Sequence, residues 1–185
     1  MSIGVRAARL GDEDALGAVH VAAWQAAYRG IMPSAYLDGL DPAERAAMWA
    51  RFFEAQGADQ ELRVVAVDGV VVGFACFGRC RDEGAEADAE LYAINLHPDH
   101  WGRGLGRRLL ADVTDRLTAH GSSAVLWVVP ENLRARSLYE SAGWADDDAR
   151  RQEDVLGAQV VEMRYCHPLG GPPKGRAWPG RGSDS

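Results

Sequence analysis

Residues 89–110 read AELYAINLHPDHWGRGLGRRLL, and this stretch decides the fold. Its first part, residues 89–97, is typical of a strand, and its last part opens a helix that we expect to run from Gly104 to about His120. The turn between them holds three glycines, Gly102, Gly104 and Gly106. Because glycine lacks a Cβ, successive backbone N–H groups in such a turn can converge on phosphate oxygens. The helix N-terminus adds unpaired N–H donors and a positive dipole end, so the stretch predicts a pyrophosphate site.

Positive side chains surround this turn. Arg103, Arg107 and Arg108 follow its first glycine, although helical spacing turns some of them away from any ligand. Two other phosphate-binding motifs are disfavoured by spacing. A dinucleotide-binding fingerprint needs glycine at position 107, which is arginine, and a P-loop needs Gly-Lys-Ser/Thr, which is absent from this turn.

The segment resembles the signature of the GNAT superfamily of acetyl-CoA-dependent N-acetyltransferases, a strand E-x-x-x-φ-x-φ followed by Q/R-x-x-G-x-G/A at the start of a helix. Residues 101–106, WGRGLG, match the second part, with Trp101 in place of the usual Gln or Arg. That residue acts largely through its backbone in the family, and the glycine register is intact. The resemblance implies acetyl-CoA as co-substrate, bound by Ile94, Leu96, Trp101, Gly102, Arg103, Gly104, Leu105, Gly106, Arg107, Asn132 and Tyr139.

A second motif follows in the order that the family has. Residues 129–144, VPENLRARSLYESAGW, resemble the family element N-x-x-A-x-x-x-Y-x-x-x-G-[FW]. From the residues alone, Asn132 is predicted to cap a short amphipathic helix that ends at Gly143, and Tyr139 is an aromatic core residue of that helix. The resemblance adds that Asn132 meets the pantetheine arm of the cofactor and that Tyr139 reaches its sulfur.

Amide formation needs an uncharged amine, a stabilised carbonyl oxygen and a proton for the departing thiolate. Strand alternation puts Glu90, Tyr92 and Ile94 on one face unless a bulge intervenes, so Glu90 is a candidate base, directly or through water. Its alternative is a solvated strand-end carboxylate. The resemblance implies that the Ile94 backbone N–H binds the acetyl oxygen and that Tyr139 is the general acid. The predicted catalytic residues are Glu90, Tyr139 and Ile94.

Length and composition favour one enzyme domain. The chain has 185 residues, of which 47% are hydrophobic and 25% are charged, and its net charge is −7. This acidity argues against broad nucleic-acid binding and is compatible with a cationic amine substrate. We expect a domain at residues 1–167 and a flexible Gly/Pro-rich tail at 168–185. Three cysteines without metal-like spacing, and no leader or bilayer-length apolar run, indicate a cytoplasmic protein with no metal site and no membrane contact.

The order of predicted elements is mixed α/β. Strands are expected at 3–10, 62–67, 70–77, 89–97, 124–129, 144–153 and 158–166, with helices at 12–29, from 42 onward, 104–120 and 132–142. Asp12 is expected to cap the first helix, and Asp68-Gly69 predicts a hairpin turn. This β-α-α-β-β-β-α-β-α-β-β order resembles the GNAT fold. The resemblance implies a central, mostly antiparallel seven-stranded sheet with flanking helices, in which the fourth and fifth strands splay apart around the pantetheine arm.

We therefore predict an acetyl-CoA-dependent N-acetyltransferase that acts by direct attack in a ternary complex. The acceptor is a small-molecule amine or a peptide amine, and Trp24, Tyr28 and the loop 30–40 are candidates for its pocket because aromatic faces attract cations. The resemblance also suggests a homodimer, because members of the family commonly form one. The alternative is a CoA-binding sensor or interaction protein that kept the fold and lost turnover.

Overall fold

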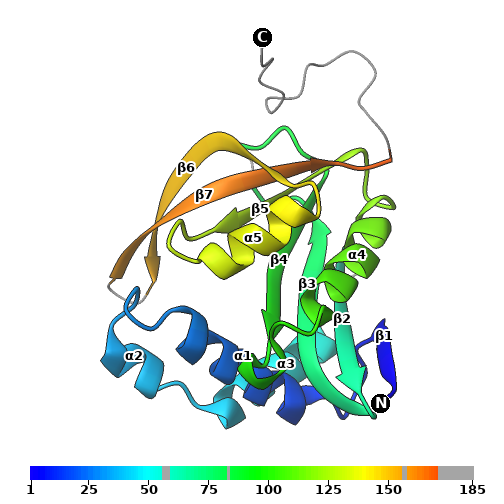
Figure 1. Ribbon diagram of the computed structural model, residues 1–185, viewed down its shortest axis with the longest axis vertical. Coiled ribbons are helices and arrows are strands. Elements are labelled where there is room, and N and C mark those ends of the chain that lie inside the picture. The colour runs from blue at the N-terminus through cyan, green and yellow to red at the C-terminus, as the bar shows by residue number, and fades with distance from the viewer. Residues whose placement is uncertain (56–58, 83, 156–157, 171–185) are drawn as a thin grey trace.

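The computed structural model describes residues 1–55, 59–82, 84–155 and 158–170, and Figure 1 shows how the elements are arranged. The elements in chain order are β1 (Ile3–Ala7), α1 (Glu13–Ala27), α2 (Ser34–Asp38), α3 (Pro42–Glu54), β2 (Gln60–Val67), β3 (Val70–Arg79), β4 (Ala89–Leu96), the 3-10 helix η1 (Pro98–His100), α4 (Leu105–Leu117), β5 (Ser123–Val128), α5 (Leu133–Ser141), β6 (Ala145–Val155) and β7 (Ala158–Pro168).

Seven strands form one sheet in the order β1-β2-β3-β4-β5-β7-β6. Neighbouring strands run antiparallel except β4 and β5, which are parallel. The β4–β5 pairing covers three positions, Ala89–Ala124, Glu90–Val125 and Leu91–Leu126, and then stops. The two strands therefore splay apart beyond Leu91, and the predicted mixed α/β fold with a split sheet is confirmed (Figure 1).

The core has a layer on each face of this sheet. On one face, α4 and α5 pack through a cluster that includes Leu109, Val113 and Tyr139. On the other face, α1 and α3 pack through Leu16, Trp49 and their neighbours. The helices therefore cover both faces and leave the split between β4 and β5 as the break in the sheet.

The Asp68-Gly69 hairpin is confirmed. Asp68 has φ 48° and Gly69 has φ 86°, so both turn residues are left-handed, as a tight two-residue hairpin turn requires. The strands that it joins, β2 and β3, are longer than predicted.

Two predictions near the N-terminus are wrong in detail. The first strand ends at Ala7 rather than Leu10, and the Asp12 side chain does not cap α1 although it holds the N-cap position. Its carboxylate instead accepts hydrogen bonds from the Arg9 N–H at 2.9 Å and from the Arg6 guanidinium at 2.7 and 2.8 Å. Because the carboxylate is engaged by Arg6 and Arg9, it makes no capping hydrogen bond to the first turn of α1.

The segment 30–40, expected as a loop, contains the short helix α2. Its Leu37 is fully buried, and the Leu37 carbonyl oxygen accepts a 2.9 Å hydrogen bond from the Gln25 side chain of α1. Tertiary contact with α1 thus stabilises a helix too short to be seen as a periodic pattern.

The C-terminal end of the domain lies beyond the expected boundary at residue 167. Strand β7 reaches Pro168, and Leu169 is buried, with its N–H bonded to the Ser122 carbonyl oxygen at 2.8 Å. Residues 171–185 of the expected tail lie outside the described residues. Among the residues that are described, none of the helices combines the length and the apolar character needed to cross a bilayer.

Candidate active site

A β-bulge in β4 sets the direction of the site residues. Phe77 of β3 pairs with Leu91, and the preceding residue Cys76 pairs with Ala93, so Tyr92 is an extra residue without a partner in β3. An extra residue reverses the alternation of side chains beyond it. Leu91 and Ile94 therefore share the face that packs toward α4 and α5. The prediction that Glu90, Tyr92 and Ile94 lie on one face is wrong for this reason.

The bulge also fixes where the backbone of β4 points. The His97 N–H donates to the Val72 carbonyl oxygen at 2.8 Å, so residues 93, 95 and 97 bond to β3. The alternate residues, Ile94 and Leu96, then direct their N–H and C=O groups away from β3 and into the gap beside β5. This is the geometry that the acetyl-oxygen and pantetheine roles of these two residues require.

The glycine turn presents unpaired donors. Gly102 has φ 73° and Gly104 has φ 76°, left-handed conformations that favour glycine. Within the described part of the chain, the N–H groups of residues 102–107 have no hydrogen-bond acceptor, because the first bond of α4 is from the Arg108 N–H to the Gly104 carbonyl. Six free donors at a helix N-terminus suit a pyrophosphate group, so the residues present fit the phosphate end of acetyl-CoA.

The arginines divide as their spacing implied. Arg107 lines the cavity described below, whereas Arg103 and Arg108 do not. Another cation, Arg134 of α5, lies over the Trp101 ring with its guanidinium carbon 4.4 Å from the ring centroid. Sequence reasoning did not predict this contact, in which the first turn of α5 places Arg134 beside the glycine turn.

Helix α5 and its N-cap contain the second motif. The Asn132 Oδ1 accepts a 3.2 Å hydrogen bond from the Ala135 N–H, so Asn132 is the predicted cap and also lines the cavity. Tyr139 is buried, and burial together with the nearby Tyr28 raises its pKa far above the ordinary value of a phenol. Its hydroxyl has no hydrogen-bond partner among the described residues, so the proton that it carries at neutral pH is available to a ligand.

One cavity of about 910 Å³ connects these parts. It runs from the glycine turn, through the gap between β4 and β5, to the aromatic end of α1. The predicted site residues that line it are Ile94, Leu96, Trp101, Gly102, Gly104, Leu105, Gly106, Arg107, Asn132 and Tyr139. The structure thus brings ten of the predicted residues to one cavity, and it leaves out Glu90 and Arg103.

Glu90 lies where β4 and β5 are still paired, before the gap opens. Its side chain is nearly buried, at 7% exposure, and its Oε2 accepts a 2.8 Å hydrogen bond from the Arg81 backbone N–H, with the Arg81 Nε at 3.9 Å. Glu90 therefore fastens the start of the 80–88 loop to β4. Its role as a base stays a prediction, and the geometry restricts that role to a route through water.

The far end of the cavity holds a carboxylate that sequence reasoning missed. Glu162 of β7 lines it together with Trp24 of α1, the C-cap residue Tyr28 and Trp127 of β5. Burial and the charge of Glu162 both raise the pKa of Tyr28. The available signal was a carboxylate within the largely apolar strand VVEMRYC, which also contains Arg164, but the local sequence does not show which part of the cavity wall that strand forms.

The split sheet, and the cavity that contains both the glycine turn and Tyr139, are typical of an N-acetyltransferase of the class that the motifs resemble. The profile described as "Acetyltransferase (GNAT) family" matches residues 22–144, so the chain belongs to this family. A relative from Bacillus subtilis (strain 168), "Uncharacterized N-acetyltransferase YuaI", is 38% identical over 166 residues, which cover 87% of this chain and 90% of that protein. The L-amino acid N-acyltransferase MnaT of Escherichia coli (strain K12) is 33% identical over 95 residues, 50% of this chain and 55% of that protein.

Solved structures agree on the fold. The yncA acetyltransferase of Salmonella typhimurium, solved with its cofactor acetyl-CoA, has a TM-score of 0.68 at 22% identity, covering 96% of this chain and 100% of that one. The PaiA N-acetyltransferase of Thermoplasma acidophilum, in complex with coenzyme A, has a TM-score of 0.66 at 21% identity, covering 89% of this chain and 98% of that one.

Proposed function

We propose that this protein transfers the acetyl group of acetyl-CoA to a primary amine by direct attack within a ternary complex. The observation that carries the proposal is the continuous cavity that joins the free N–H groups of residues 102–107 to the Tyr139 hydroxyl and then to the aromatic end of α1. A nucleotide-bearing thioester and an amine can therefore meet from opposite ends at the gap in the sheet. The structures of relatives with coenzyme A and acetyl-CoA support the choice of co-substrate.

Each part of the cavity has a separate task. The N–H groups of residues 102–107 and the Arg107 side chain hold pyrophosphate. The N–H groups of Ile94 and Leu96 take the place of the missing strand neighbour and bind polar groups of the pantetheine arm and the acetyl oxygen. Acetyl-CoA supplies the thioester whose acyl group is transferred.

Tyr139 holds the proton that the departing sulfur needs. Like any phenol, its hydroxyl is protonated at neutral pH, and burial raises its pKa further, so Tyr139 acts as a hydrogen-bond donor to the departing sulfur and passes on its proton as the thiolate forms. The acceptor is a small-molecule amine or a peptide amine. The names of two relatives, the L-amino acid N-acyltransferase MnaT and the N-alpha-acetyltransferase RimI of Mycobacterium tuberculosis, support an amine acceptor without naming one here.

The test is thiol release from acetyl-CoA in the presence of polyamines, aminoglycosides, amino acids, simple monoamines and short peptides. We expect amine-dependent release, which drops by at least about tenfold in Tyr139→Phe because general acid catalysis contributes that much or more. Glu90→Gln tests the route through water. Tight acetyl-CoA binding without release for any amine would contradict catalysis and point to a CoA-binding protein.

We also propose a cytoplasmic homodimer. Strand β6 is an edge of the sheet, so its outer backbone groups are available to a second copy of the chain, and the three cysteines Cys76, Cys80 and Cys166 are unpaired as a reducing compartment would keep them. Light scattering of the purified protein measures the oligomeric state, and cell fractionation tests the compartment.

A further inference from the structure

The end of the cavity opposite the glycine turn has its own chemical character. Its described lining is almost entirely apolar or aromatic, with one carboxylate: Trp24, Tyr28, Met32, Trp127, Val160 and Glu162. The other charged side chains among the described lining residues, Arg107 and Arg134, belong to the glycine-turn end.

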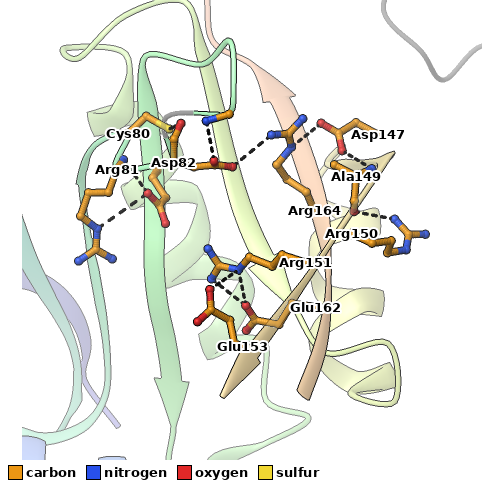
Figure 2. A network of polar contacts seen from close by, with 12 residues as sticks. Cys80, Arg81, Asp82, Asp147, Ala149, Arg150, Arg151, Glu153, Glu162 and Arg164 are labelled. Carbon is orange, nitrogen blue, oxygen red and sulfur yellow. Dashed lines mark hydrogen bonds and ion pairs between the residues drawn. The ribbon is translucent and has the colours of Figure 1, made fainter. Parts of the chain in front are cut away.

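Glu162 is held in a fixed direction by its neighbour across the strands. It pairs with Arg151 of β6 in the sheet register, and the Arg151 Nε and Nη2 atoms each lie 2.7 Å from Glu162 Oε2 (Figure 2). Among the described residues nothing bonds to the other oxygen, Oε1. The side chain is 21% exposed, so this second oxygen remains available at a partly desolvated position.

Arg151 does not line the cavity, and its guanidinium group is engaged by neighbouring side chains. Besides Glu162 it contacts the Glu153 carboxylate at 3.3 Å, and its guanidinium carbon lies 4.3 Å from the centroid of the Trp127 ring. Arg164 approaches the same ring at 5.6 Å and is itself bound by Asp82 at 3.2 Å and Asp147 at 2.7 Å (Figure 2). These two cations are neutralised by carboxylates, so neither Arg151 nor Arg164 offers an incoming anion an unpaired positive charge.

Glu162 and Tyr139 line the same cavity. Tyr28 lines it too, and the charge of Glu162 contributes to the raised pKa of Tyr28. An ammonium group at Glu162 would therefore share this cavity with Tyr139 and with the rings of Trp24 and Trp127.

We propose that Glu162 binds the amino group of the acceptor and selects primary amines that have an apolar body and no carboxylate beside the nitrogen. This inference rests on the proposed acetyl transfer. A charge-assisted bond to a partly buried carboxylate favours the cation, and the rings of Trp24 and Trp127 favour an apolar body. The α-carboxylate of a free amino acid would be placed next to Glu162 with no cation to receive it, and such like-charge contact selects against it.

The closing experiment compares 2-phenylethylamine, phenylalaninamide and phenylalanine as acceptors of the wild-type enzyme. We expect the first two, which lack the carboxylate charge, to have kcat/KM values at least about tenfold above that of phenylalanine. Equal or better use of phenylalanine would overturn the inference and leave acetyl transfer standing. Absence of release with every amine of the wider panel would overturn the proposed function as well.

Variants test the residue itself. Glu162→Gln should raise the KM for 2-phenylethylamine at least about tenfold, because the bond to the ammonium loses its charge, while the KM for acetyl-CoA stays unchanged. Glu162→Asp should restore part of the loss. Glu153→Gln is the matched control, since Glu153 also contacts Arg151 but does not line the cavity, and it should retain the wild-type KM. If Glu162→Gln and Glu153→Gln behave alike, Glu162 is a wall residue only and the inference fails.

Discussion

The Trp101 indole Nε1 donates a 2.8 Å hydrogen bond to the Leu96 backbone carbonyl oxygen. This bond fastens the glycine turn to the end of β4, with η1 enclosed between them. The position that usually carries Gln or Arg in the resembling family therefore has a side-chain role in this chain, because the indole fixes the turn against the strand that lines the gap.

Trp101→Phe removes the donor and keeps an aromatic ring under Arg134. Loss of one hydrogen bond, worth about 1 kcal/mol, should raise the KM for acetyl-CoA about three- to tenfold and leave kcat nearly unchanged. Steady-state kinetics at saturating amine measures both constants. Trp49→Phe is the control, since the Trp49 Nε1 has no partner among the described residues and Trp49 lies outside the cavity. An unchanged KM in Trp101→Phe would contradict a role for the bond.

Gly104→Ala should weaken acetyl-CoA binding by more than its cost in stability explains. Gly104 has φ 76° with open space where a Cβ would lie, so the substitution strains the backbone by about 1 kcal/mol and turns the free N–H groups from their common target. Gly11→Ala matches it, since Gly11 has φ 94°, open space and no place in the cavity. Thermal unfolding should show similar losses for both variants, and calorimetric titration should show weaker acetyl-CoA binding for Gly104→Ala alone. Equal affinities would exclude the turn as the phosphate site.

His20 should make the protein sensitive to mild acid. Burial and the Arg45 charge lower its pKa from 6.5 to about 4, and its ring packs against Trp24, Trp49 and Phe74. Protonation below pH 6.5 therefore favours the unfolded chain, and stability present above that pH is lost as the pH falls toward 4. By this linkage the free energy of unfolding at pH 5 should be about 2 kcal/mol below its value at pH 7.

Urea unfolding at the two pH values checks this expectation. His20→Leu carries no titrating group at that position and should show a markedly smaller drop. If the variant and the wild type lose the same free energy between pH 7 and pH 5, another group is responsible.

The Arg63–Asp112 pair joins β2 to α4 through two hydrogen bonds of 2.8 and 3.2 Å. Arg63 is 7% exposed, so Asp112→Asn would leave a buried guanidinium without its counter-charge and should cost about 2–4 kcal/mol of unfolding free energy. The control is Asp59→Asn, which removes the partner of Arg79 in a pair whose side chains are 72% and 70% exposed. That change should cost less than about 0.5 kcal/mol in urea unfolding, and equal costs would mean that burial does not set the value of the first pair.

Local signals were enough to predict the fold and the cofactor end of the site. The glycine turn, the Asn132 cap and the Asp68-Gly69 hairpin are each encoded within a few neighbouring residues, and the structure has all three. Their relative placement follows from the order of the strands. The ten predicted residues that share one cavity come from two segments, residues 89–110 and 129–144.

The acceptor end could not be predicted in the same way. The bulge at Tyr92, which separates Glu90 from Ile94, depends on how β4 fits against β3. The role proposed for Glu162 depends on its neighbours Arg151, on the adjacent strand, and Tyr28, at the end of α1 and far away along the chain. These relationships arise only from tertiary packing, and a strand pattern read along one segment does not contain them.

The short pairing between β4 and β5 has a thermodynamic consequence. Among the described residues, three pairs connect β4 to β5 and so join β1–β4 to β5–β7 within the sheet. Beyond Leu91 that pairing stops, and the N–H groups of Ile94 and Leu96 have no acceptor in the described part of the chain. In the proposed mode of binding, a pantetheine arm in that gap takes the place of a strand, so cofactor binding and association of the two half-sheets are thermodynamically linked. Acetyl-CoA at a hundred times its dissociation constant then adds about 2.7 kcal/mol to folding. The free energy of unfolding is accordingly larger at a high concentration of acetyl-CoA than at a low one.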